Sequence, residues 1–274
     1  ASKFSALKRK SPEPRVTPVT HWEACALLSL VTMSHVPLSK LPSFDPRQVP
    51  VSGVDHHLPA ITADQLTPQA LQARFDHPPV WTPEVLREPI FSERVPQQAA
   101  VLMPLVMRGP KGQTPYVLLT QRAAHMKTHS GQVAFPGGKV DPQDASVQAA
   151  ALREAHEEVG LHPRHVQVLG ELPVYLTGTA YHVTPVVALV STEMTLQANA
   201  DEVADVFEVP LAFLMNPAHH RRHHFEVNGM KRQWFSMPYP EARQGHQGQD
   251  DVVERFIWGA TAGMLRNFYR FLAA

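Results

Sequence analysis

Apolar runs separated by turn residues divide the chain into predicted strands. Ala99 to Met107 is strongly apolar and predicts one strand, and Tyr116 to Gln121 predicts its neighbour. Gly109-Pro110-Lys111-Gly112 supplies turn residues between the two. Later apolar runs predict strands over Val166 to Leu169, Val183 to Val190 and Val206 to Val209.

Helical spacing and a hairpin signal account for the other elements. A helix is predicted over Thr62 to Phe75, with Thr67-Pro68 as a start signal, and another over Val253 to Leu272. Phe225 to Met237 predicts a hairpin around Asn228-Gly229, a pair suited to a type I′ turn. Strands mixed with one or two packed helices indicate an α+β layered domain.

The stretch from Gly131 to Leu161 joins a glycine turn, Phe135-Pro136-Gly137-Gly138, to an alanine-rich helix. The helix is predicted from Ala145 to Glu158, because no Gly or Pro interrupts this run. Asp144 is the predicted N-cap, and Gly160 suits a left-handed C-terminal cap.

Three carboxylates crowd one side of the end of this helix. Glu154 and Glu157 are three residues apart, and Glu154 and Glu158 are four apart, so their side chains are neighbours. A hard divalent cation such as Mg2+ or Mn2+ would turn their repulsion into binding, whereas the alternative is a solvated acidic helix end. The two glycines of the turn favour the metal site, because glycine lets the backbone approach an ion or a phosphate closely.

Arg153-Glu154-Ala155-His156-Glu157-Glu158-Val159-Gly160-Leu161 resembles the second half of the Nudix box, which has the form Arg-Glu-apolar-any-Glu-Glu-any-Gly-apolar. The first half departs from the family in two ways. Eight residues separate Asp144 from Arg153, one more than the family has, and Asp144 stands where the family has a glutamate.

A second pattern lies upstream, in Leu118-Leu119-Thr120-Gln121-Arg122-Ala123 followed by Lys127, Gly131 and the glycine turn. It resembles the mark of the coenzyme A pyrophosphatase branch of the Nudix hydrolases, in which Arg usually stands at position 127. The resemblance spans residues 62 to 272. It implies a Nudix α/β/α sandwich with a mixed sheet, and metal-dependent cleavage of coenzyme A or its derivatives to 3′,5′-ADP and 4′-phosphopantetheine or acyl forms.

The resemblance also implies which residues would hold the metal. Mg2+ or Mn2+ would be bound by Glu154, Glu157 and Glu158, with the backbone carbonyl of Gly137 or Gly138 contributing. Arg153 would hold the box loop or a carboxylate in place.

Other residues would serve the proton transfer and the substrate. The general base would be either Glu157, from the box, or Glu202, from a later loop. Arg122 and Lys127 would serve the substrate phosphates, beside the backbone of Gly138. The loop from Tyr175 to His182 would shape a pocket for the pantetheine arm.

Two other functions remain open at this point. One is a Nudix pyrophosphatase for a different nucleoside diphosphate, such as NADH or ADP-ribose. The other is a Nudix-fold module that binds a nucleotide without cleaving it. Such modules usually lose box glutamates, and all three are present here.

The composition of the chain indicates which classes of partner the protein binds. The formal net charge is zero, which predicts no general attraction to nucleic acid or to an anionic membrane. No apolar run approaches the roughly 20 residues of a membrane span. A single cysteine, Cys25, suits a reducing, cytoplasmic compartment. We therefore expect a small-molecule substrate, with a homodimer as an alternative to a monomer.

The N-terminal part has a different character from the rest. Residues 1–60 are predicted to be a largely disordered extension, and residues 61–274 the hydrolase domain. Ala24 to Met33 is an apolar run, read as a tail or upstream extension in preference to a signal peptide, and residues 34–60 are a Pro-rich predicted linker.

A histidine-rich run, His219 to His224, stands near the C-terminal hairpin. Histidines four apart on a helix can bind a metal, but a solvated face is the prediction here. Cys25 has no histidine near it in the sequence, so a nucleophilic role is not expected.

Overall fold

The computed structural model describes residues 44–88, 95–126, 130–227, 230–244 and 250–274. Lys127, Cys25, the apolar run 24–33 and the predicted hairpin turn Asn228-Gly229 lie outside these ranges. In the described part, no helix combines the length and the apolar character needed to cross a bilayer.

The larger sheet is mixed and contains every strand predicted between residues 99 and 209. Its central path runs β4-β3-β2-β8-β6, with β5 paired to β2, β7 to β8 and β9 to β3. Of these pairs β2 and β8 are parallel, whereas the others are antiparallel. The strands are β2 (Gln97–Arg108), β3 (Thr114–Arg122), β4 (Val133–Ala134), β5 (Gly137–Lys139), β6 (Val166–Glu171), β7 (Tyr175–Leu176), β8 (Tyr181–Val190) and β9 (Val203–Pro210).

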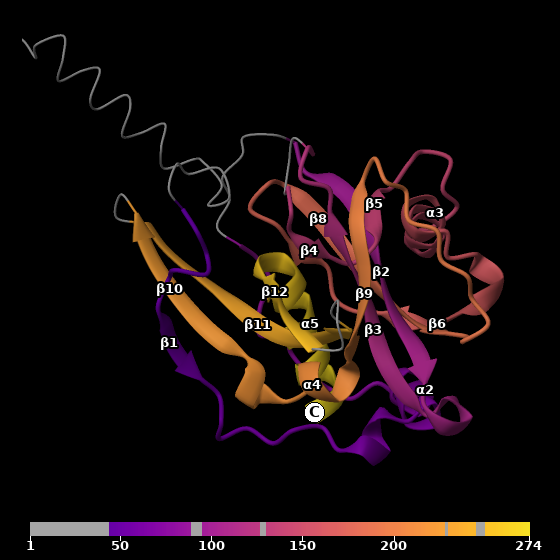
Figure 1. The fold of residues 1–274 in the computed structure, drawn as a ribbon, viewed down its shortest axis with the longest axis horizontal. Coiled ribbons are helices and arrows are strands. Elements are labelled where there is room, and N and C mark those ends of the chain that lie inside the picture. Colours follow the sequence, from indigo (N-terminus) through magenta and orange to yellow (C-terminus); the bar gives the residue numbers. More distant parts are fainter. Residues whose placement is uncertain (1–43, 89–94, 127–129, 228–229, 245–249) are drawn as a thin grey trace, which may run out of the picture.

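Helices cover both faces of this sheet (Figure 1). On β2, Leu102 and Val106 join the core that contains the buried residues of α3 (Val147–Val159). Met103 and Leu105 join the opposite core, with α2 (Pro68–Asp76) and α5 (Gly259–Ala273). Because side chains alternate across a strand, one apolar strand supplies both cores. The predicted α+β sandwich with a mixed sheet is confirmed.

A smaller antiparallel sheet packs against α5. Its order is β1-β10-β11-β12, formed by β1 (Val51–Val54), β10 (Arg221–Val227), β11 (Met230–Gln244) and β12 (Asp250–Trp258). The predicted hairpin is confirmed, since β10 and β11 pair from Arg221↔Ser236 to Val227↔Met230. Short helices complete the chain: α4 (Leu211–Leu214) and the 3-10 turns η2 (Ala63–Leu66), η3 (Pro110–Gly112), η4 (Pro163–His165) and η5 (Pro217–His219).

The helix predicted over Val253 to Leu272 is wrong in its first part. Residues up to Trp258 form β12, which pairs with β11 from Ser236↔Trp258 to Gln244↔Asp250. The helix begins only at Gly259, where φ is +62°. Pairing with the preceding strand, β11, overrides local helix propensity here.

The linker predicted over residues 34–60 differs from what its described part forms. From residue 44 onward the chain packs on the domain, and β1 pairs with β10. Asp55 is buried and bonds Arg222 through both carboxylate oxygens, at 3.0 and 2.7 Å. Tertiary contacts that are invisible in a Pro-rich stretch hold this segment in place.

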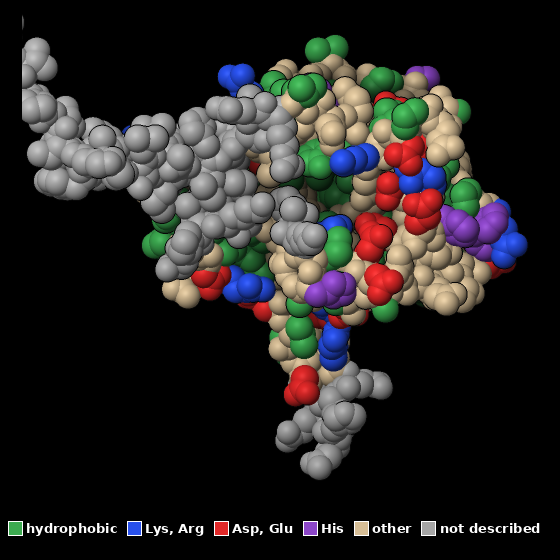
Figure 2. Space-filling model, turned by 90° about the horizontal axis from the view of Figure 1, so that it is seen from above, with side chains coloured by type: hydrophobic (Ala, Val, Ile, Leu, Met, Phe, Trp, Pro, Cys, Tyr) green, Lys and Arg blue, Asp and Glu red, His purple; other side chains and the backbone are tan. Residues whose placement is uncertain are grey.

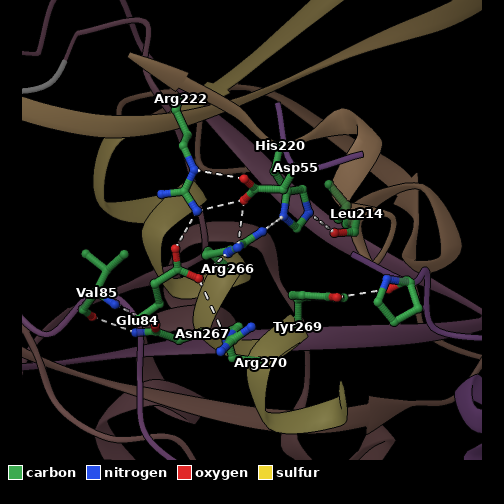
Figure 3. A network of polar contacts seen from close by, with 11 residues as sticks. Asp55, Glu84, Val85, Leu214, His220, Arg222, Arg266, Asn267, Tyr269 and Arg270 are labelled. Carbon is green, nitrogen blue, oxygen red and sulfur yellow. Dashed lines mark hydrogen bonds and ion pairs between the residues drawn. The ribbon is translucent and has the colours of Figure 1, made fainter. Parts of the chain in front are cut away.

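Asp55 belongs to a polar network that ties four segments together (Figure 3). Arg266, on α5, lies 2.7 Å from Asp55 and donates to Glu84 at 2.7 Å. Its Nη1 donates to Nδ1 of His220 at 3.1 Å, and Nε2 of His220 donates to the Leu214 carbonyl at 2.7 Å. Because each charge has an opposite partner, the burial of these groups is tolerated.

The histidine run is therefore not the predicted solvated face. His220 and His223 are buried, and residues 221–224 lie on a strand. His223 bonds the Val49 carbonyl at 3.0 Å and Ser236 Oγ at 2.8 Å. Both rings thus serve packing between segments.

Candidate active site

The glycine turn places its backbone against the carboxylates of α3. Gly137 and Gly138 lie on β5, and the Gly137 N–H donates to Glu158 Oε2 at 3.1 Å. A Cβ on Gly138 would collide with the carboxylate of Glu154, and one on Gly137 would collide with the Ala100 carbonyl. Only glycine allows this close approach.

The helix itself is capped differently from the prediction at one end. Ser146, not Asp144, is the N-cap, and its Oγ accepts from the Ala149 N–H at 3.1 Å. Asp144 is engaged elsewhere, because Arg153 donates to both of its oxygens at 3.0 Å. Gly160 caps the C-terminus with φ +70°, as predicted.

The three glutamates differ in their exposure. The exposed fractions of the side chains are 17% for Glu154, 56% for Glu157 and 5% for Glu158. Glu154 and Glu158 thus face the glycine turn, whereas Glu157 lies at the rim. The spacing brought the three together, but the direction of each side chain depends on its neighbours.

Arg153 links the box loop to the helix through a single guanidinium. Besides Asp144, it donates to Glu154 at 3.1 Å, to Glu157 at 2.9 Å and to the carbonyl of Lys139 at 3.1 Å. These hydrogen bonds, that with Asp144 first, raise the pKa of Arg153 above its usual range.

Burial and crowding disfavour the charged forms of two glutamates. Burial, followed by the charges of Glu202 and Glu154, raises the pKa of Glu158 to about 7, against the Gly137 N–H and Arg122, which lower it. Burial also raises the pKa of Glu154, with Glu157 and Glu202 adding to the rise and Arg153 opposing it. Crowded carboxylates of this kind are typical of cation sites.

The loop that carries Glu202 is joined to both α3 and β3. The Asn199 N–H donates to the Glu158 carbonyl, and the Ala123 N–H donates to the Glu202 carbonyl, each at 2.8 Å. Arg122, at the end of β3, lies 3.6 Å from the Glu158 carboxylate. Arg122, Glu202 and the box are thereby brought together, whereas Lys127 lies outside the described residues.

A cation would fit the chemistry of these donors, but the side chains do not form a complete ligand set as they lie. In the described ranges, no three His, Cys, Asp or Glu side chains are placed to hold a metal ion. Two of the three glutamates, Glu154 and Glu157, accept hydrogen bonds from Arg153. Burial is the main cause of the raised pKa values of Glu154 and Glu158, and neighbouring carboxylates add to the rise. A hard cation would neutralise the negative charge of this group.

A cavity of about 1000 Å³ extends from the glycine turn. Figure 2 shows a hollow with hydrophobic side chains at its base and acidic and basic side chains beside it. The Tyr175–His182 loop lines it through Tyr175, Thr177, Thr179 and Tyr181. The volume lies at the upper end for small-molecule pockets.

Sequence reasoning missed several residues that line this cavity. They include Arg87, Lys139, Lys231, Trp234 and Trp258. Lys139 directly follows the glycine turn and could have been suspected from that position. The others come from distant parts of the chain and carry no local signal.

Comparison with known proteins identifies the family. The NUDIX domain model matches residues 96–255. The chain is 43% identical over 188 residues to the uncharacterized Nudix hydrolase NudL of Shigella flexneri serotype 5b, covering 67% of this chain and 85% of that protein. It is 44% identical over 174 residues to NudL of Escherichia coli O1:K1, covering 62% and 80%.

Solved structures are similar over smaller parts. A Nudix hydrolase from M. smegmatis, RenU, is 24% identical, with a TM-score of 0.36, over 43% of this chain and 73% of its own. The C. elegans Ap4A hydrolase binary complex is 22% identical, with a TM-score of 0.35, over 44% and 85%. Scores this low do not establish a shared fold. The domain match over more than half of the chain does establish the family, and the protein is a member of the Nudix hydrolase family.

Proposed function

We propose that the protein is a metal-dependent coenzyme A diphosphatase that yields 3′,5′-ADP and 4′-phosphopantetheine. The observation that carries this proposal is one cavity, about 1000 Å³ in volume, whose wall contains both the glycine turn of the Nudix box and Arg122 of the upstream pattern. A pyrophosphate at the turn would leave room for both halves of a long substrate.

The carboxylates of α3 would hold Mg2+ or Mn2+. Glu154 and Glu158 would be ligands together with the carbonyl of Gly137, and Glu157 would join them by exchanging Arg153 for the ion. Such an ion neutralises phosphate charge and lowers the pKa of bound water. The Gly137 N–H orients Glu158, and Arg153 keeps Glu154 beside the turn.

Two carboxylates are candidates for the proton acceptor. Glu157 lies at the exposed rim, within 2.9 Å of Arg153. Glu202 lies close enough to Glu154 and Glu158 to raise the pKa of each, and its loop is bonded to β3. Either would accept a proton from the attacking water, and both remain open. Arg122 and Lys127 would bind the phosphates, and Arg122 lies 3.6 Å from the Glu158 carboxylate.

The test is a product assay with four substrates. Coenzyme A, an acyl-coenzyme A, NADH and ADP-ribose are incubated with Mg2+ or Mn2+, and the products are separated by chromatography. We expect 3′,5′-ADP from the first two substrates at a higher kcat/KM than for NADH or ADP-ribose. Preferred cleavage of NADH or ADP-ribose would assign a different substrate. Tight binding of coenzyme A without products would indicate a binding module.

A substitution at Glu157 tests whether this acid of the Nudix box is needed for activity. Glu157→Gln keeps the shape but removes the charge, so activity should fall about 100-fold. Glu193→Gln, at an exposed acid that does not line the cavity, is the matched control and should retain wild-type activity. Equal activity of both variants would reject the role of Glu157.

A further inference from the structure

A β-bulge interrupts the pairing of β3 and β9 next to the box. Gln121 pairs with Asp205, but the next residue of β3, Arg122, pairs with Val203. The strand β9 thus uses two residues, Val203 and Ala204, where β3 uses one. A bulge bends its strand and re-aims the side chains beside it, and bulges are frequent next to active sites. The direction of Arg122 therefore depends on what fixes the bulge.

Arg122 leaves the bulge on the side of α3. Neighbouring side chains of a strand leave opposite faces, so Gln121 and Arg122 point in opposite directions. The Arg122 side chain is 21% exposed and lies 3.6 Å from the Glu158 carboxylate. Its Nε is buried and has no hydrogen-bond partner in the part of the chain that the structure describes. A buried donor of this kind needs an acceptor from a ligand or from water, so its direction decides what it can bind.

On the opposite face, Arg255 of β12 holds Gln121. Nη1 of Arg255 donates to Gln121 Oε1 at 2.8 Å, and Nη2 donates to Asp205 Oδ2 at 2.5 Å. One guanidinium therefore bonds both residues of the last regular pair before the bulge. Its Cζ also lies over the ring of Phe207, on β9, at 4.0 Å from the centroid. Arg255 thus joins β3 and β9 at the point where their regular pairing ends.

The smaller sheet fixes Arg255 in turn. The Arg255 side chain is 3% exposed, and its Nε donates to Glu241 Oε2 at 2.8 Å. Arg243 donates to the same Glu241 oxygen at 2.8 Å and to Asp205 at 2.5 Å. Charge-assisted hydrogen bonds to two carboxylates leave a buried guanidinium little freedom. The smaller sheet therefore presents a fixed donor to the edge of the bulge.

We propose that Arg255 is a positioning residue for substrate binding. Through Gln121 and Asp205 it fixes the bulge, and the bulge sets the direction of Arg122. Arg255 does not line the cavity, whereas Arg122 does, so Arg255 acts through Arg122. The proposal rests on the proposed function in one respect, namely that Arg122 binds the phosphates of the substrate. A contact that served stability alone would leave the direction of Arg122 unchanged when it was removed.

The kinetic test breaks the contact from the side of Gln121, with whichever of the four substrates is cleaved. Gln121→Met removes the acceptor for Arg255 but keeps a side chain of similar length, so KM should rise about fivefold and kcat should change less than about twofold. Gln121→Glu keeps an acceptor and should stay close to the wild type. Arg108→Met is the matched control, because Arg108 bonds Glu208 of β9 at 3.0 and 2.6 Å and does not line the cavity. It should leave KM unchanged.

A double substitution separates positioning from a general loosening of the sheets. In the Arg122→Met protein, Gln121→Met should raise KM no further, because the side chain that it misdirects is already absent. Additive effects of the two substitutions would overturn the proposal.

An NMR signal tests the positioning without any turnover. The Nε–H signal of Arg122, assigned by its loss in Arg122→Met, should shift in Arg255→Lys, because lysine cannot bond Gln121, Asp205 and Glu241 together. It should not shift in Arg108→Met. A shifted signal with an unchanged KM would support the positioning and reject only the phosphate-binding role of Arg122 in the proposed function. An unchanged signal in Arg255→Lys would overturn the positioning role.

Discussion

Arg153 shows how one side chain organises the residues around it. Its guanidinium bonds Asp144, Glu154 and Glu157, together with the carbonyl of Lys139. Five N–H groups in a fixed plane make this possible, and lysine could not replace them. Asp144, which stands where the family has a glutamate, takes part as the main partner of Arg153 and not as a helix cap.

Gly138 should be indispensable for catalysis, because Glu154 occupies the space that a side chain at position 138 would need. Gly138→Ala should displace the Glu154 carboxylate and lower kcat at least tenfold, without a large change in the melting temperature. Steady-state kinetics and thermal unfolding measure the two effects.

Gly53→Ala is the matched control for this prediction, because a Cβ at Gly53 would meet nothing within 4 Å. It should leave kcat unchanged. If Gly138→Ala were as active as this control, the close approach of Glu154 to the turn would have no importance for catalysis.

Elements followed the local spacing where that spacing fits only one kind of element. The box helix has an apolar face toward β2 and a glycine at its end, and it forms close to where its sequence predicts. Val253 to Trp258 has apolar residues that fit either a helix or a strand, and pairing with β11 decides for the strand. The difference lies in whether the local apolar pattern fits one element or two.

The N-cap of α3 allows a test of how much one capping hydrogen bond stabilises the helix. Ser146→Ala removes the acceptor for the Ala149 N–H and should lower the free energy of unfolding by about 1 kcal/mol. Urea unfolding measures this change. Ser146→Thr keeps a hydroxyl and should stay close to the wild type. A loss as large in Ser146→Thr as in Ser146→Ala would show that the hydrogen bond is not what stabilises the helix.

Over the whole molecule, the network around Arg266 joins the N-terminal segment, residue 84, β10 and α5 (Figure 3). The smaller sheet, which forms one wall of the cavity, is held against the larger domain partly by these contacts. Arg266 has an exposed side-chain fraction of 1%, so its partners must stay in place to offset its burial.

His220 makes this network sensitive to pH. Burial, together with the charge of Arg266, lowers the pKa of His220 to about 4 from 6.5, despite its bond to the Leu214 carbonyl. The unfolded chain therefore binds a proton that the folded protein excludes, and stability falls as the pH drops from 6.5 through about 4, by about 3 kcal/mol at most. Urea unfolding at a series of pH values would measure this loss.

Glu158 works in the opposite direction, because its raised pKa makes stability fall as the pH rises from 4.5 to about 7. The contribution of His220 is therefore read from a comparison with His220→Gln. The variant should lose less stability than the wild type between pH 6.5 and 4. Parallel pH profiles for the two proteins would contradict the prediction.

Local sequence was enough to predict β2, β3, β6, β8 and β9 of the larger sheet, the box helix and the cluster of three carboxylates, but not the short strands β4, β5 and β7. The predicted features depend on apolar runs and on spacings of three and four residues, which act within a few turns of the chain. The tertiary structure was needed to establish that Val253 to Trp258 is a strand, that His220 and His223 are buried, and that residues 44–60 pack on the domain. It also decided that Lys231 and Trp234 share a cavity with Gly138. These features depend on contacts with other segments, which leave no periodicity in the local sequence.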